Sequence, residues 1–170
     1  MAAAMNSLFF KALVAFIALP GVVAYIVPAL LLGPGTNAQT PGGAGLAAIA
    51  AGTALLLWCV GEFYVSGKGT LAPWTPPIQL VVSGPYRFSR NPMYVAVALV
   101  LCGWTLAFRS RAHAIYTAAV VVAFHLRIVL GEEPWLARRH GDAWQRYRRR
   151  VPRWLGSVRD SQSRESPPIR

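Results

Sequence analysis

Two adjacent carboxylates, Glu132 and Glu133, directly follow a long apolar run and form the densest group of possible acid–base or ligand-binding side chains in the sequence. Two acids at the C-terminal end of an apolar helix would oppose the helix dipole. For Glu133 this unfavourable interaction with the dipole disappears if Glu133-Pro134 begins a new helix, because a helix N-terminus favours an acid. Glu132 is then most simply explained by a ligand that carries a cation or hydroxyl groups.

A second group of polar and aromatic residues lies in residues 66–94, which read SGKGTLAPWTPPIQLVVSGPYRFSRNPMY. This segment is longer and richer in Gly, Pro and aromatic residues than an ordinary connection between helices. Asn91-Pro92 predicts the start of a helix, with Asn91 as its N-cap and Pro92 in its first turn. The free amide groups of that turn could hold an anion such as a carboxylate, or the pair simply starts a helix; both interpretations stay open.

Aromatic and basic residues flank this predicted helix start. Tyr86 and Tyr94 fit either an aromatic belt at the membrane surface or the walls of a pocket for a ligand with a cationic centre. Arg87 and Arg90, between them, are expected to contact lipid phosphates. Arg127 lies about one turn before the end of an apolar run, and either extends to the membrane surface or orients a substrate carboxylate.

Four apolar segments must position these residues, and they cover residues 8–32, 44–65, 93–108 and 112–130. A membrane span needs about 20 residues, so the third is short. Prolines in the first segment predict kinks. Only Arg109-Ser110-Arg111 separates the last two segments, which predicts a tight antiparallel hairpin. Such a hairpin brings residues 90–94 beside residues 130–133. The expected fold is an all-α transmembrane bundle of about four spans with a pocket at one membrane face.

Composition supports a membrane protein and argues against a nucleic-acid partner. Hydrophobic residues make up 55% of the 170 residues and charged residues 14%, against about 25% charged in a soluble domain. Of the 17 Lys and Arg, 10 follow position 131, as do 5 of the 6 acids. Basic residues that flank apolar runs are typical of the cytoplasmic side, so the loop before the hairpin and both termini are expected there.

The sequence after Pro134 predicts basic amphipathic helices that lie on the membrane surface and cover the site. A break is expected near Gly141-Asp142, where a glycine and an acid interrupt the pattern. Residues 157–170 are polar and are predicted to be disordered. The chain thus divides into two N-terminal spans in residues 1–65, a core in residues 66–156, and a tail. The residues that recur at three- and four-residue steps on the apolar face are Leu136, His140, Trp144, Tyr147 and Val151.

Three ordered motifs resemble a known family: GPYRFSRNPMY before the hairpin, then EEPWL, then GDAWQRYRRRVPRWL. Together they resemble the isoprenylcysteine carboxyl methyltransferase family, and more broadly the integral membrane methyltransferases that include phospholipid N-methyltransferases. The similarity covers roughly residues 61–155. The lead-in GTLAPWTPPIQLVVSGPYR is typical of bacterial members, which implies a bacterial inner membrane.

The resemblance implies an S-adenosylmethionine site at the cytoplasmic face and a lipophilic methyl acceptor, either a carboxylate or a phospholipid amine. Membrane lipids would surround the protein, and the acceptor would enter from them. No metal site is expected. Carried over by position, the cofactor contacts would be Gln79, Leu80, Val81, Tyr86, Asn91, Pro92, Met93, Tyr94 and Glu132.

The resemblance also implies catalytic positions. Arg127 is offset by one residue from the arginine that orients substrate in eukaryotic members. An amine acceptor would lose its proton either to Glu133 or to solvent. Many relatives have His where this chain has Asn91, and an Asn cannot titrate near neutral pH. Two alternatives stay open: an NADPH-dependent membrane sterol or enone reductase, and a non-catalytic membrane scaffold with the same fold.

Overall fold

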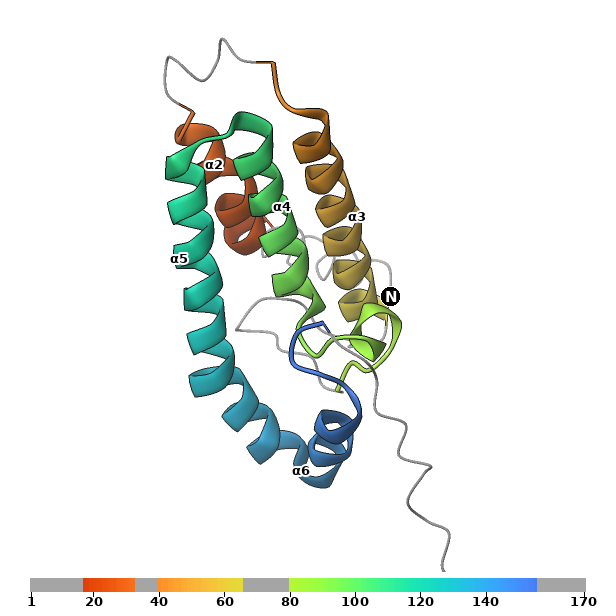
Figure 1. The fold of residues 1–170 in the computed structure, drawn as a ribbon. Helices are drawn as coiled ribbons and strands as arrows, with labels where there is room; N and C mark the ends of the chain where they lie inside the picture. The colour runs from red at the N-terminus through yellow and green to blue at the C-terminus, as the bar shows by residue number, and fades with distance from the viewer. Residues whose placement is uncertain (1–16, 33–39, 66–79, 156–170) are drawn as a thin grey trace, which may run out of the picture.

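The computed structural model describes residues 17–32, 40–65 and 80–155 (Figure 1). These residues form helices and connections and contain no strand, which confirms the predicted all-α class. Gln79, residues 8–16 of the first apolar segment and the predicted tail lie outside the described residues. The elements are η1 (Ile17–Ile26), α2 (Val27–Leu30), α3 (Gly43–Val65), η2 (Gly84–Arg87), α4 (Pro92–Phe108), α5 (Arg111–Arg127), η3 (Ile128–Glu132) and α6 (Glu133–Arg150).

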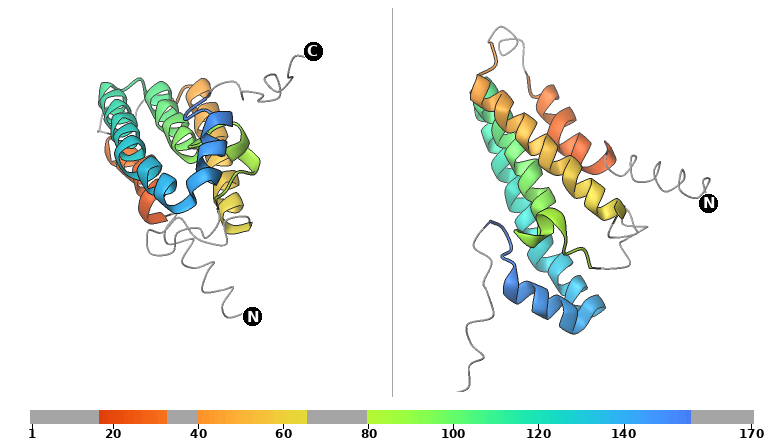
Figure 2. Two further views of the ribbon diagram at one scale, coloured as in Figure 1. Left: turned by 90° about the horizontal axis from the view of Figure 1, so that it is seen from below. Right: turned by 90° about the vertical axis from the view of Figure 1, so that its right-hand side faces the viewer.

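Helices η1–α2, α3, α4 and α5 run side by side in alternating directions (Figures 1 and 2). This bundle has two ends, the hairpin end and the α6 end. The hairpin end contains the start of α3 and the α4–α5 turn, Arg109-Ser110. The α6 end contains the start of α4, and α6 turns beneath the bundle there.

The described part of the first apolar segment is a helix distorted by proline, as predicted. Pro28 has no N–H, so the carbonyls four and five residues earlier lose their donor in the helix. Trp104 of α4 donates its Nε1–H to Ala24 O at 3.0 Å, and Tyr116 of α5 donates its hydroxyl to Val23 O at 3.1 Å. These side chains satisfy the freed carbonyls and attach η1 to both α4 and α5.

The closest helix contact joins α3 and α4. Gly103 of α4 lies against α3: a Cβ atom added there would be 2.7 Å from Ile49 Cγ1 and 2.8 Å from Gly45 O. Small residues at such a contact let two helix backbones approach each other, which is how helices associate in lipid. Leu56 and Val100 are fully buried beside this contact. The α3–α4 pair is therefore the packed centre of the bundle.

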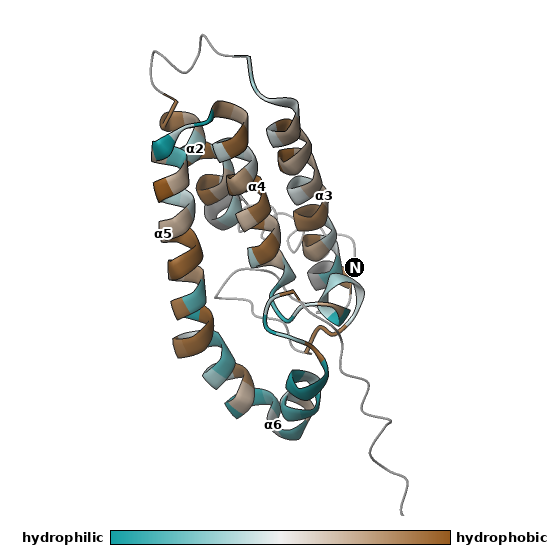
Figure 3. Cartoon of the chain, viewed as in Figure 1, coloured by the Kyte–Doolittle hydropathy of each residue, from teal (hydrophilic) through white to brown (hydrophobic). Residues whose placement is uncertain are grey.

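Among the described residues, two helical stretches are long and apolar enough to cross a membrane: Gly43–Glu62, and the 40-residue stretch Arg111–Arg150 that contains α5, η3 and α6. Pro20–Leu30 and Pro92–Phe108 are apolar but shorter. Figure 3 shows that apolar residues dominate α3, α4 and the upper part of α5, whereas α6 is largely hydrophilic. The polarity of the chain therefore changes along one continuous helical stretch.

The predicted hairpin is confirmed, because α4 ends at Phe108 and α5 begins at Arg111. The predicted helix start at Glu133-Pro134 agrees with the start of α6 at Glu133. α5 continues through the π-helical turn η3 into α6, which begins at Glu133 without a gap. The predicted break near Gly141 is confirmed, since Gly141 has a non-helical φ of 47°.

Candidate functional site

Polar side chains from the start of α4, the end of α5 and the η3–α6 corner contact one another at the α6 end of the bundle. The antiparallel hairpin places the first turn of α4 beside the last turn of α5. Tyr94 contacts Glu132, and Arg90 contacts Glu133. These two contacts confirm the predicted approach of residues 90–94 to residues 130–133. Each contact belongs to a different cluster of polar side chains.

The first cluster is formed by Glu132, Tyr94 and Arg127. The Tyr94 hydroxyl donates to Glu132 Oε1, and Arg127 Nε donates to the same oxygen at 2.9 Å and to Tyr94 Oη at 3.1 Å. The side chains of Arg127 and Glu132 are 61% and 33% exposed. Phe124 supports the Tyr94 ring, with 4.5 Å between ring centroids. This cluster is an oriented carboxylate that solvent and ligands can reach.

Glu132 keeps one oxygen available in this arrangement. Among the described residues, the hydrogen bonds to its carboxylate all end on Oε1. A carboxylate oxygen can accept further hydrogen bonds, so Oε2 can receive a hydroxyl or attract a cation. The cluster therefore has the donor and acceptor set for a ligand that carries both positive charge and hydroxyl groups.

The second cluster is centred on Glu133. Arg90 Nη1 donates to Glu133 Oε1 at 2.9 Å, and Arg153 donates to both oxygens, from Nε at 2.7 Å and from Nη2 at 2.9 Å. The Arg90 and Glu133 side chains are only 9% and 12% exposed. Burial alone would raise the pKa of Glu133, but the hydrogen bonds from Arg153 and the charge of Arg90 outweigh it and lower the pKa.

Arg90 differs from its expected role at the membrane surface. The sequence predicts that Arg90 contacts lipid phosphates, but in the structure it is paired with Glu133. Its guanidinium also lies over the Trp144 ring, 5.5 Å from the centroid. Burial lowers the pKa of Arg90, although the charge of Glu133 opposes this effect. Arg90 is therefore part of the contact between the α4 start and α6.

Asn91 occupies the predicted N-cap position of α4, with Pro92 at the helix start, but its side chain does not cap the helix. Asn91 Nδ2 instead donates to Arg153 O at 3.0 Å, and the Asn91 N–H donates to Ser89 Oγ at 3.1 Å. The Arg90 N–H donates to Pro152 O at 2.9 Å. The capping prediction is wrong because this amide group is used to attach the segment after α6.

The remaining predicted cofactor contacts lie mostly inside the structure. Tyr86 and Val81 are buried with Cys59 of α3, and Pro92 is buried at the start of α4. Tyr147 of α6 donates its hydroxyl to Tyr86 O at 2.7 Å. Leu80 packs against the buried face of α6, and Met93 packs against the α3–α4 core. The predicted contacts that share an accessible cluster are Tyr94 and Glu132.

Sequence reasoning missed two contributors at this end. Arg153 binds Glu133 and reaches Asn91 through its carbonyl. Glu62, near the end of α3, accepts a hydrogen bond from Ser83 Oγ at 2.6 Å. Gly84 follows with a φ of 53°, and a Cβ atom there would lie 2.5 Å from Glu62 Oε1. The isolation of Glu62 as the one carboxylate before position 131 was a signal for such a contact.

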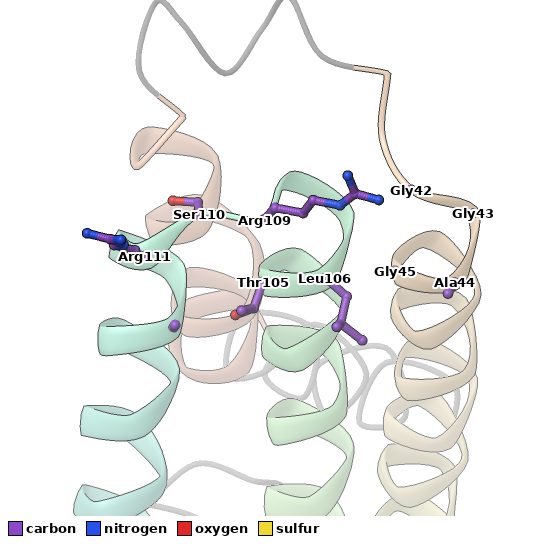
Figure 4. Close-up of a pocket in the computed structure, with 10 residues that line it drawn as sticks. Gly42, Gly43, Ala44, Gly45, Thr105, Leu106, Arg109, Ser110 and Arg111 are labelled. Carbon is purple, nitrogen blue, oxygen red and sulfur yellow. The ribbon is translucent and has the colours of Figure 1, made fainter.

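A cavity of about 580 Å³ lies at the opposite, hairpin end (Figure 4). Its walls come from Gly42–Gly45 and from the α4–α5 turn. Figure 4 shows Arg109 extending toward Gly42 and Arg111 pointing away from it. Within the described part of the chain, no predicted site residue and no carboxylate lines this cavity. The candidate site therefore stays at the α6 end.

Comparison with known proteins gives one family. The family model described as phospholipid methyltransferase matches residues 43–143, which is more than half of the chain. The matched region runs from the start of α3 into α6 and contains Tyr94, Arg127 and Glu132. No curated protein and no solved structure matches the chain.

Proposed function

This chain belongs to the phospholipid methyltransferase family, and on that premise we propose that it is an S-adenosylmethionine-dependent methyltransferase with a lipophilic acceptor. Family membership and two long apolar helices make it a helical membrane protein. The resemblance to integral membrane methyltransferases is confirmed at the level of this family. The cofactor, the acceptor and the topology form the proposal.

The observation that carries the proposal is the cluster of Glu132, Tyr94 and Arg127. The cofactor would supply an activated methyl group on a cationic sulfonium. Glu132 Oε2 is free among the described contacts to attract that charge or accept a ribose hydroxyl. Tyr94 presents an aromatic ring beside the carboxylate, and aromatic faces attract cations. The residues present therefore fit this cofactor.

The protein would assist the reaction mainly by aligning and dehydrating the methyl acceptor, and less by proton transfer. Displacement at a methyl group needs the acceptor held in line and stripped of water. A carboxylate acceptor needs no base, and the guanidinium of Arg127 could orient it. An amine acceptor must lose a proton, and Glu133 is a weak base because two arginines hold its pKa low. The proton of an amine would therefore leave to solvent.

The proposed topology has four crossings, with the α6 end at the cytoplasmic face of a bacterial inner membrane. Arg87 and the arginines of α6 gather at this end, and Arg109 and Arg111 lie at the other. The more basic side of a membrane protein is normally cytoplasmic. α6 would lie along the membrane surface, with Trp144 and Tyr147 facing the protein. A lipophilic acceptor would reach Tyr94 laterally from the bilayer.

The decisive experiment is incubation of the purified full chain with methyl-labelled S-adenosylmethionine and a membrane lipid extract. We expect label in the lipid fraction: base-labile label would identify a methyl ester and stable label a methylated amine. An Asp142→Asn variant, changed at an exposed acid outside both clusters, serves as the control that retains activity. Tight NADPH binding without S-adenosylmethionine binding would identify a reductase instead, and binding of neither cofactor would identify a scaffold.

A further inference from the structure

A second cavity at the α6 end differs in charge from the Glu132 cluster. It measures about 570 Å³ and lies between residues 80–87 and the C-terminal half of α6. Its charged walls are Arg87, Arg146 and Arg150, and its apolar walls include Leu80, Val82 and Val151. Three cations from two separate segments thus face one space that is also lined by hydrocarbon.

The three arginines are not neutralised within the part of the chain that the structure describes. All three are exposed, and the ion pairs there involve only Arg90, Arg127 and Arg153 among the arginines. Asp142 lies one turn before Arg146 on α6, yet the two form no ion pair among the described contacts. Converging guanidinium groups match the geometry of phosphate oxygens.

The apolar walls of this cavity favour an anion that also carries a hydrocarbon part. Val82 is 47% exposed, and Leu80 is only partly buried. A ligand that fills the cavity therefore has both a negative charge and a hydrocarbon part. In a membrane protein, the bilayer supplies such molecules as phospholipids, and basic pockets beside transmembrane helices bind their headgroups.

We propose that Arg87, Arg146 and Arg150 bind the phosphate of an anionic phospholipid from the adjacent leaflet, with its hydrocarbon against Val82 and Leu80. This site is separate from the Glu132 cluster, since three guanidinium groups would repel a sulfonium. Tyr147 lines the cavity and donates its hydroxyl to Tyr86 O, so the cavity wall is attached to the segment before α4. The proposal does not depend on methyl transfer.

The test is native mass spectrometry of the purified full chain, titrated in detergent with phosphatidylglycerol, phosphatidylcholine or diacylglycerol. We expect one phosphatidylglycerol to remain bound, with weaker retention of the other two lipids. The triple variant Arg87→Gln, Arg146→Gln and Arg150→Gln is expected to bind phosphatidylglycerol at least about tenfold more weakly, because each arginine near an anionic lipid strengthens the attraction. Circular dichroism checks that the variant stays folded.

The matched control is Arg138→Gln, Arg139→Gln and Arg149→Gln, which removes the same charge from exposed positions of α6 outside the cavity. We expect this control to bind phosphatidylglycerol like the wild type. Equal weakening in both triple variants would overturn the proposal in favour of general charge attraction. Equal binding of diacylglycerol would identify a purely apolar groove, and full displacement of the lipid by inorganic phosphate at equal concentration would identify a site for free phosphate.

A segment of the chain itself is the remaining competitor for the cavity. Asp160 and Glu165 follow α6 in the sequence and carry the opposite charge. The full-length variant Asp160→Asn, Glu165→Gln is expected to bind phosphatidylglycerol like the wild type. Binding in this variant but not in the wild type would assign the cavity to the chain's own acidic segment and overturn the lipid site.

Discussion

At the hairpin end of the bundle, α3 and α4 are joined by backbone contacts, whereas ion pairs hold the α6 end together. The Gly42 N–H donates to Ala107 O at 2.9 Å, and Gly103 admits the α3 backbone. Among the described residues, no ion pair lies at that end. At the α6 end, Glu132 and Glu133 bind three arginines between them.

The difference suggests separate roles for the two ends: the hairpin end stabilises the fold, and the α6 end can bind a ligand. Close helix contacts tolerate almost no added volume, so the hairpin end should lose its fold when a glycine is replaced. The α6 end has partly exposed charges that can exchange one partner for another. Substitutions there should change binding or local order before they unfold the bundle.

Gly103→Leu tests the hairpin end and has the largest expected effect. A side chain at this position would collide with Ile49 and with the backbone of Gly45. We expect a loss of at least about 3 kcal/mol of stability, seen as a low yield of monodisperse protein and a lower thermal midpoint. Gly61→Leu is the control, because a Cβ there meets nothing within 4 Å. Equal losses in both variants would contradict close packing as the cause.

Glu133→Ala tests the ion-paired end. It removes the shared partner of Arg90 and Arg153 and leaves a nearly buried guanidinium unpaired. We expect about 3 kcal/mol of destabilisation, the lower part of the range for breaking a buried pair. Thermal unfolding measures the loss, and hydrogen exchange should locate it at residues 89–94 and 151–153. Faster exchange in α3 instead would show that the two ends are not separate.

Acidification should weaken the α6 end selectively. The folded pKa of Glu133 lies below its ordinary value of 4.5. Its stabilisation is therefore fully present above about pH 4.5 and is lost as the pH falls through the folded pKa. We expect the difference in thermal midpoint between the wild type and Glu133→Gln to shrink as the pH falls from 6 to 3. A constant difference over that interval would argue against an ionised Glu133.

Tyr94→Phe tests whether a small change inside the Glu132 cluster alters ligand binding without altering stability. The variant removes the hydroxyl that donates to Glu132 but keeps the ring against Phe124. We expect about fivefold weaker S-adenosylmethionine binding by calorimetry, since one hydrogen bond contributes about 1 kcal/mol. The thermal midpoint should hardly change. Tyr116→Phe, which loses a hydroxyl contact to η1 instead, should keep wild-type affinity.

Much of the fold could be predicted from the sequence because lipid demands long apolar helices and short connections. The two residues between α4 and α5 permit only an antiparallel hairpin, and this geometry brings Tyr94 to Glu132. The helix start at Pro92 also follows from local chemistry. These features depend on contacts that are near in sequence or on the direction of two joined helices.

The details of the site could not be predicted, because they depend on contacts distant in sequence. The Asn91 side chain binds the carbonyl of Arg153, 62 positions away. Glu132 and Glu133 serve different clusters because neighbouring residues on a helix point about 100° apart. The π-helical turn η3, which ends at Glu132, sets the direction of each, and such turns often occur at functional sites.

Calorimetry on the Glu132→Gln variant measures whether the Glu132 cluster binds S-adenosylmethionine, as proposed above. The change removes the negative charge but keeps the shape of the side chain, and Asp142→Asn removes an equal charge from an exposed position of α6. We expect Glu132→Gln to bind the cofactor at least about tenfold more weakly, the loss expected for one charge-assisted hydrogen bond, with an unchanged thermal midpoint. Asp142→Asn should bind like the wild type. Wild-type affinity in Glu132→Gln would show that the Glu132 cluster is not the cofactor site.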